Sequence, residues 1–173
     1  MTSLRLFSPL QLRGVTARNR LVVAPMCQYS AIDGHANAWH LVHLGRFALG
    51  GFGIVMVEAT AVSPEGRISP ADVGLWDDAH IRPLARIAEF LRDNGAVPAI
   101  QIAHAGRKAS SQRPWEGGNA LPADDPQAWE TIAPSAVAFG ADWPTPRELT
   151  VEDLADVREN WRCAAERALE AGF

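Results

Sequence analysis

Leu21-Val22-Val23-Ala24-Pro25-Met26-Cys27-Gln28-Tyr29 is the stretch of the chain that decides the fold. An apolar, β-branched run stops at a proline, and a thiol and a phenol follow within four residues. A short run of this kind, ended by a breaker, is typical of a buried strand. In parallel α/β folds, reactive groups lie in the loops just past the carboxyl ends of the strands. Cys27 and Tyr29 are therefore candidate catalytic residues.

Turn signals and hydrophobic spacing predict the elements on both sides of this strand. Ahead of it, weak alternation predicts a short hairpin. Behind it we expect strands at residues 53–57 and 96–102, and helices at 38–49, at 79–94 and from the N-cap Thr150 to Gly172. Residues 63–78 are expected to form a loop. The Pro/Gly/Trp-rich segment 109–146 is long enough to predict a functional excursion or a lid.

This order of elements predicts an α/β fold with three right-handed βα units and parallel strands. Three strands cannot close a barrel, and a parallel sheet needs cover on both faces. Alone, such a chain would expose strand edges and apolar surface. We therefore expect residues 1–173 to form part of a larger unit, with Gly172-Phe173 poised to open a fourth strand.

Composition narrows the class of protein. The 173 residues are 47% hydrophobic and 21% charged, as in globular proteins, and the net charge of −4 provides no basic field for nucleic acid or an anionic membrane. The apolar runs are shorter than a membrane span requires, and Met1-Thr2-Ser3-Leu4-Arg5 does not begin a secretory signal. Two cysteines make no disulfide framework, so we expect a cytoplasmic, reducing location.

The two cysteines and the single tyrosine have different expected roles. The position of Cys27 just past a strand favours a tuned thiol over a small buried hydrophobe. Cys163 lies within the apolar stripe of the last helix, so we expect it in the core. Tyr29 could donate a proton or hydrogen bond to a substrate oxygen, or be an ordinary amphipathic surface residue.

Further polar residues lie near predicted strand ends. Gln101 interrupts an apolar strand, and an inward amide there suits a cofactor ring that carries several hydrogen-bonding atoms, or makes a structural hydrogen bond inside a barrel. His104 and Arg107 follow this strand and could bind ligands or anchor the loop. His40 and His43 form an H-x-x-H pair that falls short of a zinc site, so we expect satisfied or partly exposed histidines and no metal centre.

Several long motifs, in order, resemble the old yellow enzyme family of flavin-dependent ene-reductases, in particular the bacterial branch that includes the xenobiotic reductases. The similarity covers essentially the whole chain. The matching stretches are Asn19-Arg20, Ala24-Pro25-Met26-Cys27-Gln28-Tyr29, Val57-Glu58-Ala59-Thr60-Ala61-Val62, Pro64-Glu65-Gly66-Arg67-Ile68, Gln101-Ile102-Ala103-His104-Ala105-Gly106-Arg107-Lys108-Ala109, Ile132-Ala133-Pro134-Ser135-Ala136 and Ala171-Gly172-Phe173.

The resemblance implies that residues 1–173 are the N-terminal portion of a single (β/α)8 TIM-barrel domain, truncated after about three βα units. It implies FMN as cofactor, NADPH or NADH as reductant, an activated alkene such as an enone as substrate, and a homo-oligomer in the full-length form. By position, Cys27 would tune the flavin and touch substrate, and Tyr29 would polarise the substrate carbonyl. The residues implied to contact FMN are Ala24, Pro25, Met26, Cys27, Ala59 and Gln101.

The resemblance also implies that the family's paired histidines, proton-donor tyrosine and phosphate-binding loops belong beyond Phe173, so we expect this chain to be inactive alone. A different class of protein is a non-catalytic half-barrel that acts as a structural or self-associating module. A third interpretation is a decarboxylase or dehydrogenase on a barrel scaffold, supported by architecture alone.

Overall fold

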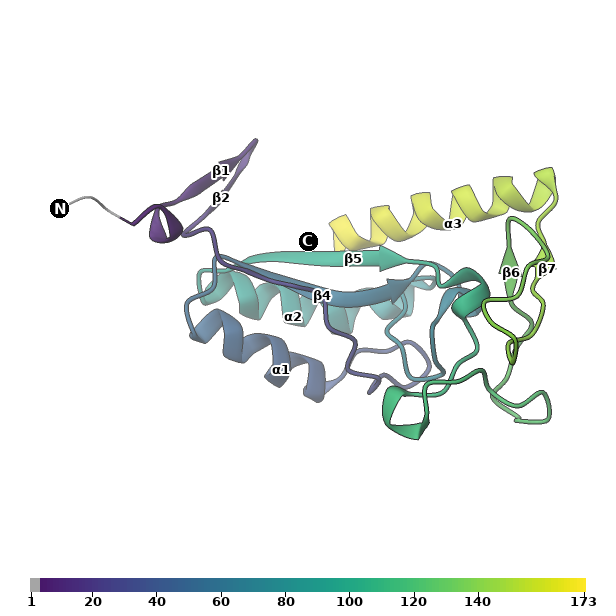
Figure 1. Cartoon of the computed structure of the whole chain (residues 1–173). Helices are drawn as coiled ribbons and strands as arrows, with labels where there is room; N and C mark the ends of the chain where they lie inside the picture. The colour runs from purple at the N-terminus through teal and green to yellow at the C-terminus, as the bar shows by residue number, and fades with distance from the viewer. Residues whose placement is uncertain (1–3) are drawn as a thin grey trace.

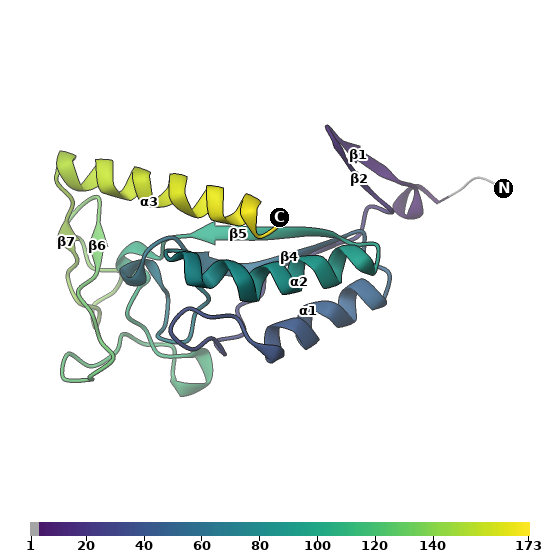
Figure 2. The ribbon, with the colours of Figure 1, turned by 180° about the vertical axis from the view of Figure 1, so that it is seen from behind.

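The computed structural model describes residues 4–173, and the Met1–Ser3 part of the N-terminal prediction lies outside them. Its centre is a parallel sheet in the order β3 (Val22–Val23), β4 (Ile54–Ala61) and β5 (Val97–Ala103) (Figure 1). Helices α1 (Ala38–Leu49) and α2 (Ile81–Asp93) lie side by side across one face of this sheet (Figure 2). The prediction of an α/β fold with three parallel βα units is confirmed.

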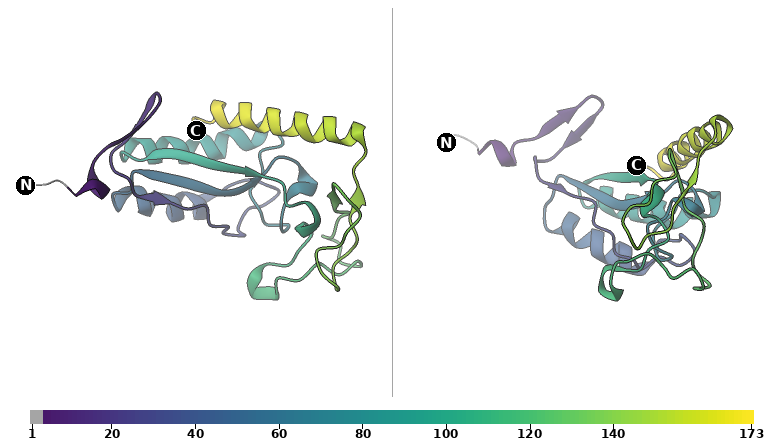
Figure 3. Two further views of the ribbon diagram at one scale, coloured as in Figure 1. Left: turned by 45° about the horizontal axis from the view of Figure 1, so that its top comes forward. Right: turned by 45° about the vertical axis from the view of Figure 1, so that its right-hand side comes forward.

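The remaining elements lie at the two ends of the sheet. A hairpin of β1 (Leu10–Leu12) and β2 (Val15–Ala17) projects from the amino ends of the strands (Figure 3). The long excursion gathers at the carboxyl ends, where β6 (Ile132–Ala133) pairs in parallel with β7 (Arg147–Glu148). Helix α3 (Val151–Glu170) returns along β5 and α2. The carboxyl ends of β3, β4 and β5 therefore meet the longest loops of the chain.

The core lies between the sheet and its helices. Val55 and Val57 of β4 point toward the helices and are fully buried, as are Leu84 and Leu91 of α2. Alternation along the strands places a second set of side chains on the opposite face of the sheet. No helix of residues 4–173 covers this face, which we call the open face (Figure 3). That set is exposed or half-buried and comprises Val22, Ala24, Ile54, Met56, Ala99 and Gln101.

A β-bulge changes this alternation near the carboxyl end of β4. Val57 pairs with Ile100, but the next pair joins Ala59 to Gln101, which leaves Glu58 as the extra residue. A bulge residue drops out of the ladder and reverses which face the following residues occupy. Ala59 therefore lies beside Gln101 on the open face, and Glu58 is free to turn its side chain toward the neighbouring loop.

Local capping sets the ends of the helices, and at Thr150 and Gly172 it does so as the sequence predicts. The Asn37 side chain accepts a hydrogen bond from the Trp39 amide and begins α1. Thr150 and Asp153 exchange side chain–to–backbone hydrogen bonds at the start of α3. Gly95 and Gly172 follow α2 and α3 with φ of 75° and 92°, a conformation that favours glycine.

Three predicted features differ in the structure. The 79–94 helix is divided, because a short 3-10 turn at Asp78–His80 precedes α2. The segment 63–78, predicted as a loop, contains a 3-10 turn at Pro64–Gly66, and its Val73–Leu75 main chain pairs with Ala61 at the end of β4. The prediction that Cys163 lies in the core is wrong: it is half-buried, and its Sγ lies 3.5 Å from a Glu159 carboxylate oxygen.

Helix α3 explains that error. Only Ala164 and Ala168 of its apolar stripe are buried, against the β5 and α2 side. Leu154, Trp161 and Leu169 are exposed because no further layer of residues 4–173 packs on them. Within these residues, none of the helices is long and apolar enough to cross a membrane.

Replacement of a core leucine should test this packing. Leu84→Ala removes a fully buried side chain between α2 and the sheet, and the cavity should lower the free energy of unfolding by about 2–5 kcal/mol. Leu169→Ala, at an exposed helical position, is the matched control and should change it by less than about 0.5 kcal/mol. Urea unfolding measures both; equal losses would contradict the assigned core.

Candidate functional site

The sequence-predicted site residues gather at the carboxyl end of the open sheet face. Ala24 to Tyr29 form the turn after β3, while Ala59 and Gln101 are neighbours across β4 and β5. Ala24 and Gln101 are exposed, and Met26 is 42% exposed. Small side chains and one free amide thus border a region that is open to solvent.

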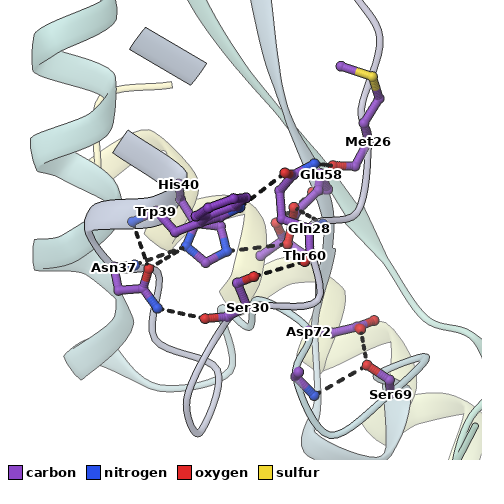
Figure 4. A network of polar contacts seen from close by, with 11 residues as sticks. Met26, Gln28, Ser30, Asn37, Trp39, His40, Glu58, Thr60, Ser69 and Asp72 are labelled. Carbon is purple, nitrogen blue, oxygen red and sulfur yellow. Dashed lines mark hydrogen bonds and ion pairs between the residues drawn. The ribbon is translucent and has the colours of Figure 1, made fainter. Parts of the chain in front are cut away.

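A buried carboxylate fixes the turn that carries the thiol and the phenol. Glu58 Oε2 accepts a hydrogen bond of 2.6 Å from the Gln28 amide, between Cys27 and Tyr29 (Figure 4). Its other oxygen lies 3.5 Å from His40 Nε2 of α1, and the two side chains are only 3% and 1% exposed. His40 Nδ1 accepts from the Asn37 amide at 3.0 Å. The bulge residue therefore joins β4, the turn and the start of α1.

The Gln28 side chain strengthens the same link. Trp39 Nε1 donates to Gln28 Oε1 at 3.1 Å, and Gln28 Nε2 donates to the Met26 carbonyl at 2.8 Å. Asn37 Nδ2 in turn donates to the Ser30 carbonyl at 2.6 Å (Figure 4). The Gln28 side chain thus binds α1, while its neighbours Cys27 and Tyr29 contribute to the site.

Both the Cys27 thiol and the Tyr29 phenol are held in their protonated forms. Burial, with Asp72 and Glu58 nearby, raises the pKa of Cys27 to about 11. Burial also raises the pKa of Tyr29 to about 12, with the adjacent Cys27 as the next cause. At neutral pH both groups are therefore hydrogen-bond donors and not anions.

Tyr29 is held in an unusual backbone conformation. Its φ of 49° lies in the left-handed region, which costs a non-glycine residue about 1–2 kcal/mol. The ring meets Trp115 edge to face, with centroids 5.6 Å apart. A strained residue persists only where its surroundings hold it, and here the Glu58–Gln28 hydrogen bond and the Trp115 contact do so.

Sequence reasoning missed Asp72 and the role of Glu58. Asp72 is buried, and its carboxylate accepts hydrogen bonds from the Ile68 amide at 2.8 Å and Ser69 Oγ at 2.7 Å. Burial raises its pKa to about 6. The available signal was the same for both residues: an acidic side chain inside an apolar segment, Ala71 to Val73 and Val57 to Ala59. Such a carboxylate must find donors, so it marks an organised site.

The histidines mostly serve local structure. His40 is buried, and its Nε2 has no hydrogen-bond partner within residues 4–173, so the prediction of a satisfied histidine is wrong there. His43 is half-buried, with Arg46 3.2 Å from its Nδ1. His104 Nδ1 accepts from the Gly106 amide at 3.0 Å, which favours the loop-anchoring interpretation, and Arg107 reaches the Val137 carbonyl at 3.4 Å. Residues 4–173 contain no group of three or more side chains placed to hold a metal ion.

Parallel βα units with a site at the carboxyl ends of the strands define part of an α/β barrel of the kind that enzymes use. The chain belongs to the NADH:flavin oxidoreductase / NADH oxidase family, whose sequence model matches residues 5–173. This confirms the predicted membership of the old yellow enzyme family, an FMN-dependent class that uses a reduced nicotinamide.

Relatives and solved structures agree with the family. The chain is 48% identical over 174 residues to an NADH:flavin oxidoreductase of Gibberella zeae, covering 99% of this chain and 42% of that one. It is 42% identical to an NADPH dehydrogenase of Bacillus licheniformis, covering 100% and 47%. Morphinone reductase superposes with a TM-score of 0.81 at 28% identity, covering 97% and 46%. The chain spans under half the length of these proteins, and the structure is correspondingly an open part of a TIM barrel.

The open face fits an isoalloxazine ring. A flat heteroaromatic ring needs small side chains beneath it and polar groups at its edge. Ala24 and Ala59 provide the first, and the Gln101 amide, which has no hydrogen-bond partner within residues 4–173, provides the second. The bulge at Glu58 places Ala59 and Gln101 next to each other on this face.

Loss of the Glu58 carboxylate should release the turn and change the reactivity of Cys27. In Glu58→Ala the Gln28 amide loses its acceptor and Cys27 loses a nearby negative charge, so the pKa of Cys27 should fall below about 11, while burial and Asp72 keep it above its ordinary 9.0. Alkylation by iodoacetamide at pH 8 should accelerate roughly tenfold for each unit of pKa. Glu58→Gln keeps an acceptor and should have the smaller effect.

Mass spectrometry of the Cys27 peptide separates this reaction from that of Cys163. Glu89→Ala, an exposed glutamate on α2, is the control and should leave the rate unchanged. The same alkylation rate in all three variants and the parent would show that Glu58 does not hold the turn.

The raised pKa of Asp72 predicts a pH-dependent stability. An unfolded aspartate ionises near 3.8, whereas folded Asp72 keeps its proton until about pH 6. The folded state therefore binds more protons between these values, and stability falls by about 3 kcal/mol as pH rises through them. Asp72→Asn cannot ionise, so the difference in urea stability between it and the parent should show this fall. A difference that does not vary between pH 3 and pH 7 would contradict a buried, late-ionising Asp72.

Proposed function

We propose that this chain supplies part of the FMN site of an NAD(P)H-dependent ene-reductase, through the turn after β3 and the open sheet face. The enzyme would reduce activated C=C bonds such as those of enones. The observation that carries the proposal is the free Gln101 amide beside Ala59 on the open sheet face. Family membership over residues 5–173 supports the cofactor and the class of reaction. A cytoplasmic location and a homo-oligomeric full-length form stay predictions.

The flavin-facing residues would bind the ring through close packing and through hydrogen bonds from one side-chain amide. Bound FMN would supply the chemistry of hydride transfer between a reduced nicotinamide and an electron-poor alkene. Ala24 and Ala59 would allow close approach of the ring, with Pro25 and Met26 at its border. Gln101 both donates and accepts hydrogen bonds, so it can bind ring atoms of either kind.

Cys27 and Tyr29 would act as neutral donors at the substrate side. The Tyr29 hydroxyl keeps its proton at neutral pH and could donate a hydrogen bond to the oxygen of an enone. Such a donor stabilises negative charge as it develops on that oxygen. The protonated Cys27 thiol would contact the ring and substrate as a polarisable group, without nucleophilic attack.

A self-associating half-barrel without turnover is the second candidate. The exposed apolar side chains at the α1–β3 edge favour it, since covering them would gain free energy. These side chains are Val22, Trp39, Val42 and Leu49. A dimer that binds no flavin would support this candidate against the enzyme.

The role of Gln101 tests the proposed enzyme. In the protein that contains this chain, Gln101→Leu should weaken FMN binding by roughly tenfold, because a ring hydrogen bond is lost, while the urea midpoint stays unchanged. Gln127→Leu, at another exposed position, is the control. Flavin absorbance in an equilibrium titration measures affinity, and NADPH-driven loss of enone absorbance measures turnover.

Two results would contradict the proposal. The first is unchanged FMN affinity in Gln101→Leu. The second is a parent protein that retains no flavin and reduces no enone. Tight FMN binding and turnover by residues 1–173 alone would instead contradict the expectation that this chain supplies only one part of the site.

A further inference from the structure

Trp115 is a large side chain held at the edge of the candidate site without cover from the described residues. It lies in the Pro114–Glu116 turn of the long excursion and is 65% exposed. Its contact with the site is through Tyr29, whose ring it meets edge to face at an interplanar angle of 84°. The Arg113 guanidinium lies 6.0 Å from the indole centroid. The sequence motifs assign no role to this tryptophan.

The segment that presents Trp115 is fixed at its base. Ser111 donates twice to the Ile68 carbonyl, through its amide and its Oγ, both at 2.8 Å. Gln112 donates to the Asn119 carbonyl at 2.8 Å and so closes the loop on itself. Ile68 is in turn held by Asp72. The base of the turn that carries Trp115 is therefore hydrogen-bonded to the loop after β4.

Trp115 lies close enough to Tyr29 to contact a group that is bound there. With ring centroids 5.6 Å apart, the indole lies about one ring width from the phenol. A substrate whose oxygen accepts from the Tyr29 hydroxyl would place its carbon skeleton within reach of the indole. An indole contributes a rigid, flat apolar surface, which binds a flat ring better than a flexible chain.

We propose that Trp115 is a specificity-determining residue that forms the outer wall of the substrate region and favours flat, ring-bearing enones over open-chain ones. This inference rests on the proposed function, since it places the substrate oxygen at Tyr29. The edge-to-face contact also means that Trp115 supports the strained Tyr29 backbone. The two effects differ in outcome: a wall changes the preference between substrates, whereas support of Tyr29 alone changes all substrates equally.

The experiment uses the full-length flavin-loaded protein and equilibrium binding in place of turnover. Perturbation of flavin absorbance gives dissociation constants for cyclohexenone and for a hexenone, an open-chain enone with the same number of carbons. Trp115→Ala should weaken cyclohexenone binding about tenfold and hexenone binding by less than about twofold. Trp115→Phe keeps an aromatic face and should recover most of the loss.

Trp161→Ala, on α3 away from Tyr29, is the matched control and should leave both constants unchanged. Urea unfolding of Trp115→Ala should show a midpoint only slightly below that of the parent, because the edge-to-face contact that supports Tyr29 is lost but no buried side chain is removed. Equal weakening of both enones, or no weakening, would overturn the specificity role while leaving the proposed function in place. A parent protein that binds neither FMN nor enone would overturn the proposed function, and this inference with it.

Discussion

The buried carboxylate of Glu58 is the constraint on which the site depends. A carboxylate inside a protein costs several kcal/mol unless donors surround it. Here one donor comes from another element, the Gln28 amide of the turn after β3, which binds Oε2. The other oxygen lies 3.5 Å from His40 Nε2 of α1 without a hydrogen-bond partner within residues 4–173. Because the carboxylate must be satisfied, the turn cannot move away from β4 without leaving it unpaired. The positions of Cys27 and Tyr29 follow from that requirement.

The bulge that exposes this carboxylate also builds the open face. If β4 continued without an extra residue, Glu58 would pair with Gln101 and Ala59 would point toward the helices. The bulge moves Ala59 into phase with Gln101 and turns Glu58 toward Gln28. Glu58 therefore positions the turn that carries Cys27, and the bulge positions the residues of the sheet that would face a flavin ring.

The sequence predicted those parts of the molecule that depend on local signals. Hydrophobic spacing and capping chemistry within a few residues predicted the 38–49 helix and the helix that begins at the Thr150 cap. The family motifs named Cys27, Ala59 and Gln101, which the structure places at one end of the sheet. The Glu58–Gln28 hydrogen bond and the Tyr29–Trp115 contact join distant segments, so no local pattern revealed them. Asp72 binds residues three and four positions away, and only its place in an apolar segment signalled it. Cys163 was misplaced because spacing shows a stripe but not whether another layer covers it.

Burial and two nearby acids determine what chemistry the Cys27–Tyr29 turn can perform. Burial is the main cause of the raised pKa values of Cys27 and Tyr29, and Asp72 and Glu58 raise them further, because an added negative charge would lie near existing or potential carboxylates. A thiolate nucleophile would require the opposite surroundings, a nearby cation or a helix N-terminus. The turn instead keeps two neutral donors in place, each able to share a proton with an oxygen that becomes negative during reaction. Its electrostatics therefore favour polarisation of an acceptor carbonyl and disfavour covalent catalysis by Cys27.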